Sequence, residues 1–498
     1  MALEKEQLFE NLASQGIAIT FDDVRIVTGE ERSHVKANET DISTQITKNE
    51  TANSPIISAA MSTVTMAEMA ITVAIEGGYG TIPASLSVDQ QRKEVRKVKK
   101  FMTAYIDEPI TVGPDYTIER ILKDKAGYDQ DFSTFPVVDT ENRLLGILTS
   151  NDFAFTRTEL TNTASQIMTP VEDIVVVNRG TKYKKAYEVM KDNKKKTLPV
   201  INSKTGKLVG LYLFSDVARM VEEDKSMYNL DERGRLKVAA AVPTDPEEAV
   251  IRMKALEKYA DLIVIDSSQG DHDYTFETLI AMKEAGATKD IMAGNVDNPK
   301  AALLLAEAGA DGIKVGKGGG SICSTRPNLG IGTPQVTAVY ECAKAVDRLD
   351  VPVCSDGGIT NNGDIAIALA VGAKTVMMGN MFAGTDEAPG EVRTLSDQTK
   401  WKVYRGEGSL EALQENASSR QRYNQSAKGE VIAPQGVSGL VPYKGSASEI
   451  CKLSIAYLRQ TMSHTNCQNL EEFNRKTKLW RVTNAGLHES RVHDVAVN

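Results

Sequence analysis

The chain has 498 residues, of which 41% are hydrophobic and 25% charged, as expected for a soluble globular protein with more than one domain. Its formal net charge of −9 argues against a basic surface for nucleic acid, and no apolar run reaches the length of a membrane span. The five cysteines form no close-spaced metal or disulfide pattern and the N-terminus lacks a signal-peptide core, so we expect a cytoplasmic protein.

The first hundred residues contain two short apolar segments, 55–61 and 78–82, which are candidate strands. Between about residues 102 and 225 the sequence pattern changes, and an approximate internal repeat appears. Residues 135–149 match residues 198–212, and each copy reads strand, turn, strand, helix after a preceding helical stretch. This pattern predicts a duplicated small α/β module, with copies at about 102–160 and 161–225.

From about residue 235 onward, short apolar strands alternate with amphipathic helices. The expected strands are 236–242, 262–266, 291–293, 312–315, 351–354 and 375–378, and the expected helices are 246–259, 275–285, 298–308 and 363–371. Polar or glycine-bearing loops follow the strands, which favours a (β/α)₈ TIM barrel, although a doubly wound sheet makes a similar pattern. The barrel would comprise residues 1–101 and 226–498, interrupted by the insert.

The stretch 315–326, Val-Gly-Lys-Gly-Gly-Gly-Ser-Ile-Cys-Ser-Thr-Arg, is the most informative of the chain. A strand runs into a glycine-rich loop whose bare N–H groups can hold a phosphate. Cys323 follows this loop directly, which indicates a nucleophile aimed at the rest of a phosphorylated substrate. The alternative is an ordinary glycine turn beside a small buried hydrophobic residue.

Segments along the whole chain resemble the inosine-5′-monophosphate (IMP) dehydrogenase family. They are Ile-Thr-Phe-Asp-Asp-Val at 19–24, Ala-Gly-Asn-Val at 293–296, Gly-Ser-Ile-Cys at 320–323, Ser-Asp-Gly-Gly-Ile at 355–359, Gly-Thr-Asp-Glu-Ala-Pro-Gly-Glu at 384–391, Tyr-Arg-Gly-Glu-Gly-Ser at 404–409, Val-Pro-Tyr-Lys-Gly at 441–445 and Gly-Leu-His-Glu-Ser at 486–490. The resemblance implies a barrel with an inserted tandem CBS pair. It also implies NAD-dependent oxidation of IMP to xanthosine 5′-monophosphate (XMP) in guanine nucleotide biosynthesis.

The resemblance makes Cys323 the nucleophile that attacks carbon 2 of hypoxanthine, after which the adduct gives a hydride to NAD. A mobile flap, about 409–436, would then help to hydrolyse the covalent intermediate. Arg422 fits the general base of that step, with Thr325 and Tyr423 orienting the water. Gln435 stands where the family often has a glutamate, and since glutamine cannot act as a base, Arg422 would carry more of the catalysis.

The resemblance also implies binding residues. Asp356 would accept hydrogen bonds from the ribose hydroxyls. The alternative role for Asp356 is the N-cap of a helix from Gly357 onward. The implied IMP-binding residues are Ser58, Met61, Ser321, Asp356, Gly358, Gly379, Asn380, Tyr404, Gly406, Glu407, Gly408 and Gln435. Those on the NAD side are Asp266, Ser267, Ser268, Asn295, Gly316 and Gly318.

A monovalent cation, K⁺, is implied by the same resemblance. Its expected ligands are carbonyls of Gly318, Gly320 and Cys323 with Glu489, Ser490 and Arg491 of a neighbouring subunit. The shared site implies a homotetramer, which the CBS pairs are able to join into an octamer. Regulatory purine nucleotides would use Thr149 and Asp152 in the first copy and Asp216 in the second, unless the insert is purely structural.

Two alternatives remain open. Guanosine 5′-monophosphate (GMP) reductase shares the barrel, the cysteine and the threonine, and uses NADPH to deaminate GMP to IMP, but it lacks the Arg-Tyr flap. Two departures from the dehydrogenase pattern leave this alternative open. They are the run 80–85, Gly-Thr-Ile-Pro-Ala-Ser, and Ser62 at a position where aspartate is common. The other alternative is a catalytically idle nucleotide-sensing assembly, against which Cys323, Thr325 and Asp356 argue.

Overall fold

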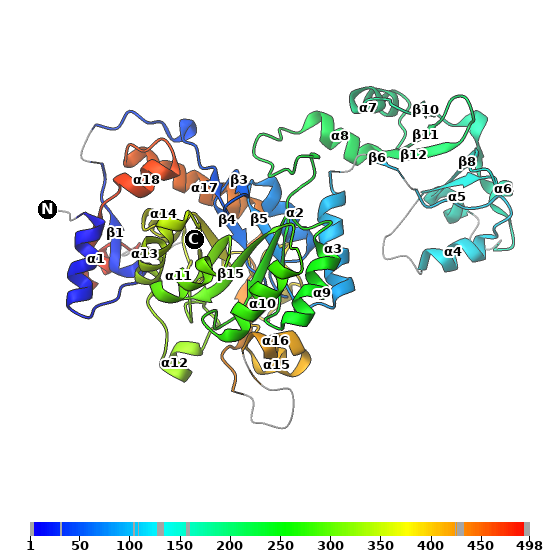
Figure 1. The fold of residues 1–498 in the computed structure, drawn as a ribbon. Coiled ribbons are helices and arrows are strands. Elements are labelled where there is room, and N and C mark those ends of the chain that lie inside the picture. Colours follow the sequence, from blue (N-terminus) through cyan, green and yellow to red (C-terminus); the bar gives the residue numbers. More distant parts are fainter. Residues whose placement is uncertain are drawn as a thin grey trace. The chain divides into compact units, whose positions relative to one another are not determined.

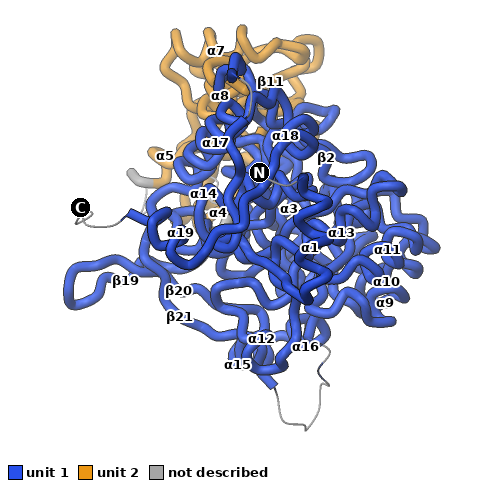
Figure 2. Tube along the Cα trace, turned by 90° about the vertical axis from the view of Figure 1, so that its left-hand side faces the viewer, with its two compact units in different colours: residues 1–99, 226–498 blue, residues 100–225 orange. Residues whose placement is uncertain are grey.

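The computed structural model describes residues 4–29, 32–102, 105–107, 109–126, 134–155, 160–423, 425 and 433–492. The chain divides into two compact units, one formed by residues 1–99 with 226–498 and the other by residues 100–225 (Figure 2). No helix among the described residues is long and apolar enough to cross a lipid bilayer.

The first unit contains a closed barrel of eight parallel strands (Figure 1). Around the barrel the strands follow the order β13 (Ala239–Val242), β14 (Leu262–Asp266), β15 (Asp290–Val296), β16 (Gly312–Val315), β17 (Val353–Asp356), β18 (Thr375–Met378), β4 (Ile56–Ser58) and β5 (Tyr79–Ile82). The two N-terminal strands close the ring, because β4 pairs with β18 and β5 pairs with β13. The barrel prediction is therefore confirmed, and the doubly wound sheet is excluded.

Helices follow the barrel strands along the chain and cover the barrel from outside (Figure 1). They are α2 (Ala67–Ile75), α3 (Val88–Lys100), α9 (Pro246–Leu256), α10 (Asp273–Glu284), α11 (Pro299–Glu307), α13 (Gln335–Val346), α14 (Asn362–Ala370) and α17 (Ala447–His464). Local sequence sets several helix starts: Asp245 and Asn298 cap α9 and α11 through side-chain hydrogen bonds, and a proline follows each cap.

The N-cap reading of Asp356 is wrong. Helix α14 begins at Asn362, and Asn361 is its N-cap, with a side chain that accepts hydrogen bonds from the next turn. Asp356 instead ends strand β17, and a glycine pair with positive φ, Gly357 and Gly358, follows it. Glycine tolerates this backbone region, so the chain turns away from the barrel before the helix starts.

The remaining elements of the first unit lie around the barrel. They are α1 (Lys5–Ser14), β1 (Val24–Ile26) paired with β22 (Leu479–Arg481), β2 (Thr44–Gln45) paired with β3 (Thr51–Ala52), α12 (Thr325–Leu329), a sheet of β19 (Arg393–Thr394), β20 (Lys400–Arg405) and β21 (Ser438–Pro442), then α15 (Leu410–Glu415), α16 (Ala417–Arg422), α18 (Leu470–Lys476) and α19 (Asn484–Glu489). The expected flap, 409–436, covers α15 and α16, while residues 424 and 426–432 of it lie outside the described residues.

The second unit contains two small sheets, β7-β8-β9 and β10-β11-β12-β6. Its elements are β6 (Tyr105–Ile106), α4 (Ile118–Ala126), β7 (Thr134–Val138), β8 (Leu144–Thr149), α5 (Ser150–Phe155), α6 (Ala164–Ile167), β9 (Thr169–Pro170), β10 (Val177–Asn178), α7 (Tyr183–Asp192), β11 (Thr197–Ile201), β12 (Leu208–Leu213) and α8 (Phe214–Glu222). The hairpins β7-β8 and β11-β12 are antiparallel and share a register shift at equivalent positions. The internal repeat of the sequence is thus a repeat of structure.

A buried ion network ties α3 to the barrel. Lys99 is 3% exposed, and its Nζ lies 3.0 Å from Asp231 and 2.6 Å from Asp261. Although burial alone would raise the pKa of Asp231, the N–H of Arg235 and the Lys99 ammonium hold it at about 2. Burial raises the pKa of Asp261 despite the same lysine. Lys99 therefore holds two carboxylates that would otherwise repel each other.

We expect Lys99→Met to destabilise the first unit by about 3–5 kcal/mol at pH 8, because both carboxylates lose their common cation. The loss should be smaller at pH 5, since unpaired buried carboxylates gain protons more readily. Urea unfolding followed by tryptophan fluorescence tests this, because both tryptophans, 401 and 480, belong to this unit.

Lys97→Met on the same helix is the control, since Lys97 makes a partly exposed pair with Glu94 and should cost less than about 1 kcal/mol. In the unmutated protein, the stability contributed by Asp231 is present above about pH 4, and is lost as the pH falls toward the folded-state pKa of about 2. Equal losses for the two lysine variants would contradict the assigned role of Lys99.

Candidate active site

One cavity lies where the loops that follow strands β14 to β17 meet segments from the C-terminal third of the chain. Its lining contains many of the predicted site residues: Met61, Ser267, Ser268, Asn295, Gly316, Gly318, Gly320, Cys323, Thr325, Asp356, Tyr404, Gly406, Glu407, Arg422, Tyr423 and Gln435. Met61 comes from the N-terminal part of the chain and the others from residues 267–435, and closure of the barrel brings them together. This is the face on which TIM-barrel enzymes carry their active sites.

Cys323 is half-buried in the loop between β16 and α12. Its Sγ lies 3.1 Å from Thr325 Oγ1 and 3.5 Å from the carbonyl oxygen of Gln435. The Thr325 hydroxyl in turn lies 3.2 Å from Gln435 Oε1. An isolated antiparallel bridge between Cys323 and Gly436 fixes this arrangement. The thiol, a hydroxyl and an amide thus meet at one wall of the cavity.

The glycine loop packs closely against the end of β17. Gly316 has a φ of +147°, and a Cβ atom there would overlap the carbonyl oxygen of Asp356. Only glycine permits this conformation and this approach. The Asn295 amide completes the junction by donating to the Gly316 carbonyl at 2.8 Å and to Asp356 Oδ2 at 2.9 Å. The Asp356 carboxylate is thereby fixed beside the loop that leads to Cys323.

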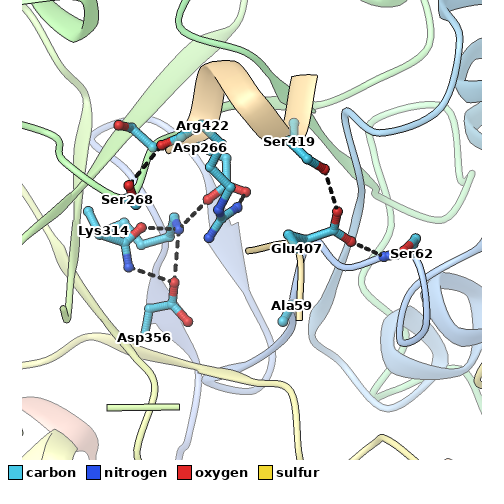
Figure 3. Close-up of polar contacts among 12 residues, drawn as sticks. Ala59, Ser62, Asp266, Ser268, Lys314, Asp356, Glu407, Ser419 and Arg422 are labelled. Atoms are coloured by element: carbon cyan, nitrogen blue, oxygen red, sulfur yellow. Dashed lines mark hydrogen bonds and ion pairs between the residues drawn. The ribbon is translucent and has the colours of Figure 1, made fainter. Parts of the chain in front are cut away.

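Lys314 lies below the cavity, 1% exposed, in strand β16. Its Nζ is 2.8 Å from Asp266 Oδ1 and 2.8 Å from Asp356 Oδ2, and it also contacts Asn295 Oδ1 (Figure 3). All three protons of the ammonium thus have acceptors. We call Lys314, Asp266, Asp356 and Asn295 the lysine cluster. In it, the lysine of β16 holds the carboxylates that end strands β14 and β17 in fixed positions.

Helix α16 lies over this cluster. The guanidinium of Arg422 pairs with Asp266 (Figure 3). The backbone carbonyl of Arg422 accepts hydrogen bonds from Ser268 N at 3.0 Å and from Ser268 Oγ at 2.8 Å. The next residue, Tyr423, packs its ring against Gly408, where an added Cβ would lie 2.5 Å from the ring. Arg422 and Tyr423 therefore reach the cavity that contains Cys323.

Two tyrosines of the cavity keep their protons. Burial raises the pKa of Tyr423, an effect that the neighbouring Arg422 guanidinium only partly offsets. Burial also raises the pKa of Tyr404 far above its ordinary value. The Tyr404 hydroxyl lies 3.8 Å from Met61 Sδ, and close to Gly379, where a Cβ would meet it at 2.8 Å. Both phenols are therefore neutral hydrogen-bonding groups at neutral pH.

Other predicted residues lie outside the cavity lining. Ser58 is fully buried at the end of β4 and accepts from Thr65 Oγ1 at 2.9 Å, and Asp266 lies behind Arg422 in the lysine cluster. The cavity lining also lacks Ser321, Gly358, Gly379, Asn380 and Gly408, together with the expected cation ligands Glu489, Ser490 and Arg491. Arg491 lies 3.4 Å from Asp22 of the same chain.

The three regulatory candidates belong to the second unit. Thr149 donates to Asp152 Oδ2 through its backbone N–H at 2.6 Å and its hydroxyl at 2.8 Å, an arrangement that starts helix α5. Asp216 lies 3.1 Å from Arg219, and burial raises its pKa although that arginine opposes the shift. Both carboxylates therefore already have partners within the unit.

Sequence reasoning missed Lys314, Ser62 and Ser419. A charged residue inside the four-residue strand Gly-Ile-Lys-Val was the available signal for Lys314, because a lysine in a fully buried strand needs acidic partners. Ser419 carried no signal, since it is ordinary in its local sequence. Ser62 stood out only as a departure from the aspartate common in the family, and this did not reveal its contact, because Ser62 contributes only its backbone N–H.

The fold and the site define a TIM-barrel protein with a thiol and an arginine-tyrosine pair around one cavity. Comparison with known proteins gives the family. The family model described as "IMP dehydrogenase / GMP reductase domain" matches residues 18–493, and the chain belongs to this family.

Curated relatives span the same length. The chain is 42% identical to inosine-5′-monophosphate dehydrogenase of Aquifex aeolicus over 481 residues, and 38% identical to that of Escherichia coli strain K12 over 484 residues, with 96% of each chain covered in both comparisons. Among solved structures, a cysteine-to-alanine variant of Trypanosoma brucei GMP reductase in complex with guanosine 5′-monophosphate matches with a TM-score of 0.82. It is 34% identical and covers 97% of this chain and 100% of that chain.

Proposed function

We propose that this protein oxidises IMP to XMP with NAD, a step of guanine nucleotide biosynthesis. The observation that carries the proposal is the shared cavity of Cys323, Thr325, Arg422 and Tyr423. A thiol suits covalent catalysis at the purine, and an arginine-tyrosine pair suits a second step with water. The curated relatives cited above, which match along the whole chain, are named for this activity.

For the substrate, Asp356 would accept the ribose hydroxyls, because a carboxylate is an acceptor-only group. The glycine loop before Cys323 and the turn at Gly358 offer backbone N–H groups for the phosphate. Met61 and Tyr404 would lie against the nucleotide near Gly379. The other proposed contacts are Ser58, Ser321, Asn380, Gly406, Glu407, Gly408 and Gln435.

In the first step, Cys323 loses its proton and Sγ forms a bond to carbon 2 of the purine. Bound NAD supplies the hydride acceptor, so that the C2–H bond breaks and the purine remains attached to Cys323. Ser268, Asn295 and Asp266 would bind the nicotinamide ribose, with Ser267, Gly316 and Gly318 beside it. This donor and acceptor set fits a ribose diol, but Asp266 and Ser268 also contact Arg422.

Arg422 of helix α16 therefore occupies groups that the cofactor needs. Arg422 and the nicotinamide ribose cannot both bind Asp266 at the same time. In the second step α16 returns, and water adds to carbon 2 while the C–S bond breaks and XMP leaves. An isolated guanidinium is a poor proton acceptor. Arg422 can accept the proton of water as it passes one of its own to Asp266, so that the guanidinium keeps its charge and the carboxylate becomes neutral. Thr325 and Tyr423 hold the water.

Gly408→Ala should slow this second step about tenfold to hundredfold, because its Cβ would displace the Tyr423 ring by around an ångström. The burst of NADH from the first turnover should remain, while the steady-state rate falls. Gly439→Ala is the control, since its Cβ would meet nothing within 4 Å. A steady-state rate equal to that of the control would show that Tyr423 does not need this position.

A monovalent cation fits the loop in part. Carbonyl oxygens of Gly318, Gly320 and Cys323 suit K⁺, and the Gly320 carbonyl, which accepts from Cys323 N at 3.0 Å, has a second lone pair free. Glu489, Ser490 and Arg491 of a neighbouring subunit in a homotetramer would complete the site.

The second unit resembles a CBS pair. It would bind purine nucleotides through Thr149, Asp152 and Asp216, and it would join tetramers into octamers.

Absorbance at 340 nm tests the proposal. Purified protein is offered IMP with NAD and, separately, GMP with NADPH. We expect NADH to appear in the first mixture, with XMP as its product on chromatography. Loss of NADPH in the second mixture alone would make the protein a GMP reductase, the activity for which the Trypanosoma brucei relative is named. No change in absorbance at 340 nm in either mixture would favour a catalytically idle nucleotide-sensing assembly.

A further inference from the structure

Glu407 lies in the loop between β20 and α15 and is 6% exposed. Its Oε1 accepts the backbone N–H of Ser62 at 2.7 Å, and its Oε2 accepts the hydroxyl of Ser419 at 3.2 Å. Figure 3 shows the carboxylate between these two partners. Both oxygens of a buried charge are therefore used, and neither bond joins Glu407 to the loop of Cys323.

The two partners belong to different parts of the site. Ser62 follows Met61, which lines the cavity beside Tyr404. Ser419 is 2% exposed on α16, three residues before Arg422, and residues three apart share one face of a helix. The Glu407 carboxylate thus connects the loop after β4 to the helix that carries Arg422 and Tyr423.

The bond from Arg420 to the Leu413 carbonyl joins α16 only to α15, and the contacts of α16 with the barrel cannot take over this task. Those through Asp266 and Ser268 involve groups that the cofactor would occupy. The contacts of Gln421 with Thr244 and Glu248 are both 3.4 Å long. Glu248 is also a carboxylate, but its side chain is 35% exposed, whereas Glu407 and Ser419 are 6% and 2% exposed. A hydrogen bond to a charged group is stronger where water is excluded.

We propose that Glu407 is a positioning residue that docks α16 through Ser419 and so places Arg422 and Tyr423 for the hydrolytic step. The proposal rests on the function proposed above. Glu407 acts through the helix, because the structure records no direct contact between its carboxylate and the Arg422 side chain in the described part of the chain. Both residues line a second cavity of about 20 Å³, which has room for one water.

The test compares Ser419→Ala, Glu407→Ala and Glu407→Gln with Ser418→Ala, a control that removes the neighbouring hydroxyl of the same helix. Ser419→Ala and Glu407→Ala should lower kcat about tenfold to hundredfold, as expected for loss of hydrogen bonds to a charged group. Glu407→Gln should be clearly faster than Glu407→Ala, because its carbonyl can accept from Ser62 N–H and its amide can hydrogen-bond to the Ser419 hydroxyl.

The ratio kcat/KM for NAD separates positioning from general damage. It reports on steps up to NADH release, which precede the return of α16, so it should not fall while kcat falls. Mass spectrometry after acid quenching should find more purine attached to Cys323 in the two slow variants. Ser419→Ala keeps the test valid if Glu407→Ala does not fold.

The proposal is overturned if Ser419→Ala behaves like Ser418→Ala, if Glu407→Gln is as slow as Glu407→Ala, or if kcat/KM falls together with kcat. Failure of the underlying function would look different, because the unmutated protein itself would then produce no NADH from IMP and NAD.

Discussion

Cys323→Ser should abolish NADH formation from IMP and NAD, with a loss of at least about 10⁴-fold in kcat, because a hydroxyl cannot replace the thiolate as nucleophile. The serine side chain is close in size and can keep the contact with Thr325, which lies 3.1 Å from the sulfur. The change therefore removes chemistry rather than shape. Stopped-flow absorbance at 340 nm should show neither a burst nor a steady rate.

Binding of IMP should survive this change, since Asp356 and the glycine loop are untouched. Isothermal titration calorimetry should give a Kd for IMP within about threefold of the unmutated value, a difference of less than 1 kcal/mol. Cys342→Ser is the matched control, because Cys342 is a buried cysteine of helix α13 outside the cavity. Residual NADH formation by Cys323→Ser at more than about 1% of the normal rate would rule out covalent catalysis through this thiol.

Arg422→Ala should lower kcat about 10²–10⁴-fold while leaving the first turnover intact, because a positioned proton acceptor contributes a factor of this size. NADH should appear as a burst of about one equivalent per site, followed by a slow phase in which the covalent purine adduct persists. The ion pair with Asp266 is lost as well, so α16 competes less for the cofactor site and the KM for NAD should fall.

Arg420→Lys is the control for this prediction. Arg420 lies on the same helix, but its guanidinium donates to the Leu413 carbonyl at 2.6 Å and does not line the cavity. If Arg420→Lys slowed hydrolysis as strongly as Arg422→Ala, the position of the base would be misassigned. An Arg422→Ala variant without a burst would place this arginine in the first step instead.

The barrel could be predicted because its strands are short, apolar and evenly spaced. The predicted strands 262–266, 312–315 and 375–378 coincide with β14, β16 and β18. Helix α14 begins later than the N-cap reading of Asp356 requires, since Gly357 and Gly358 adopt positive φ and turn the chain first. A sequence does not reveal which of two polar residues caps a helix until the loop geometry is known.

Much of the candidate site could be predicted because the motif around Cys323 and the strand-end loops carry recognisable residues. The lysine cluster and the Glu407 bridge could not, because their partners lie far apart in sequence. Lys314 reaches Asp266 and Asp356 only after the barrel closes, and Glu407 joins Ser62 to Ser419 across more than 300 residues. Such contacts depend on tertiary structure and leave no local pattern.

The most direct test of the account is a search for the covalent intermediate. The Arg422→Ala protein is mixed with IMP and NAD, quenched in acid, digested and analysed by mass spectrometry. We predict one modified peptide, containing Cys323 with the purine nucleotide attached, in an amount that matches the NADH burst. NADH formed without any modification of Cys323 would contradict the account, even if the protein proved to be an IMP dehydrogenase by its products.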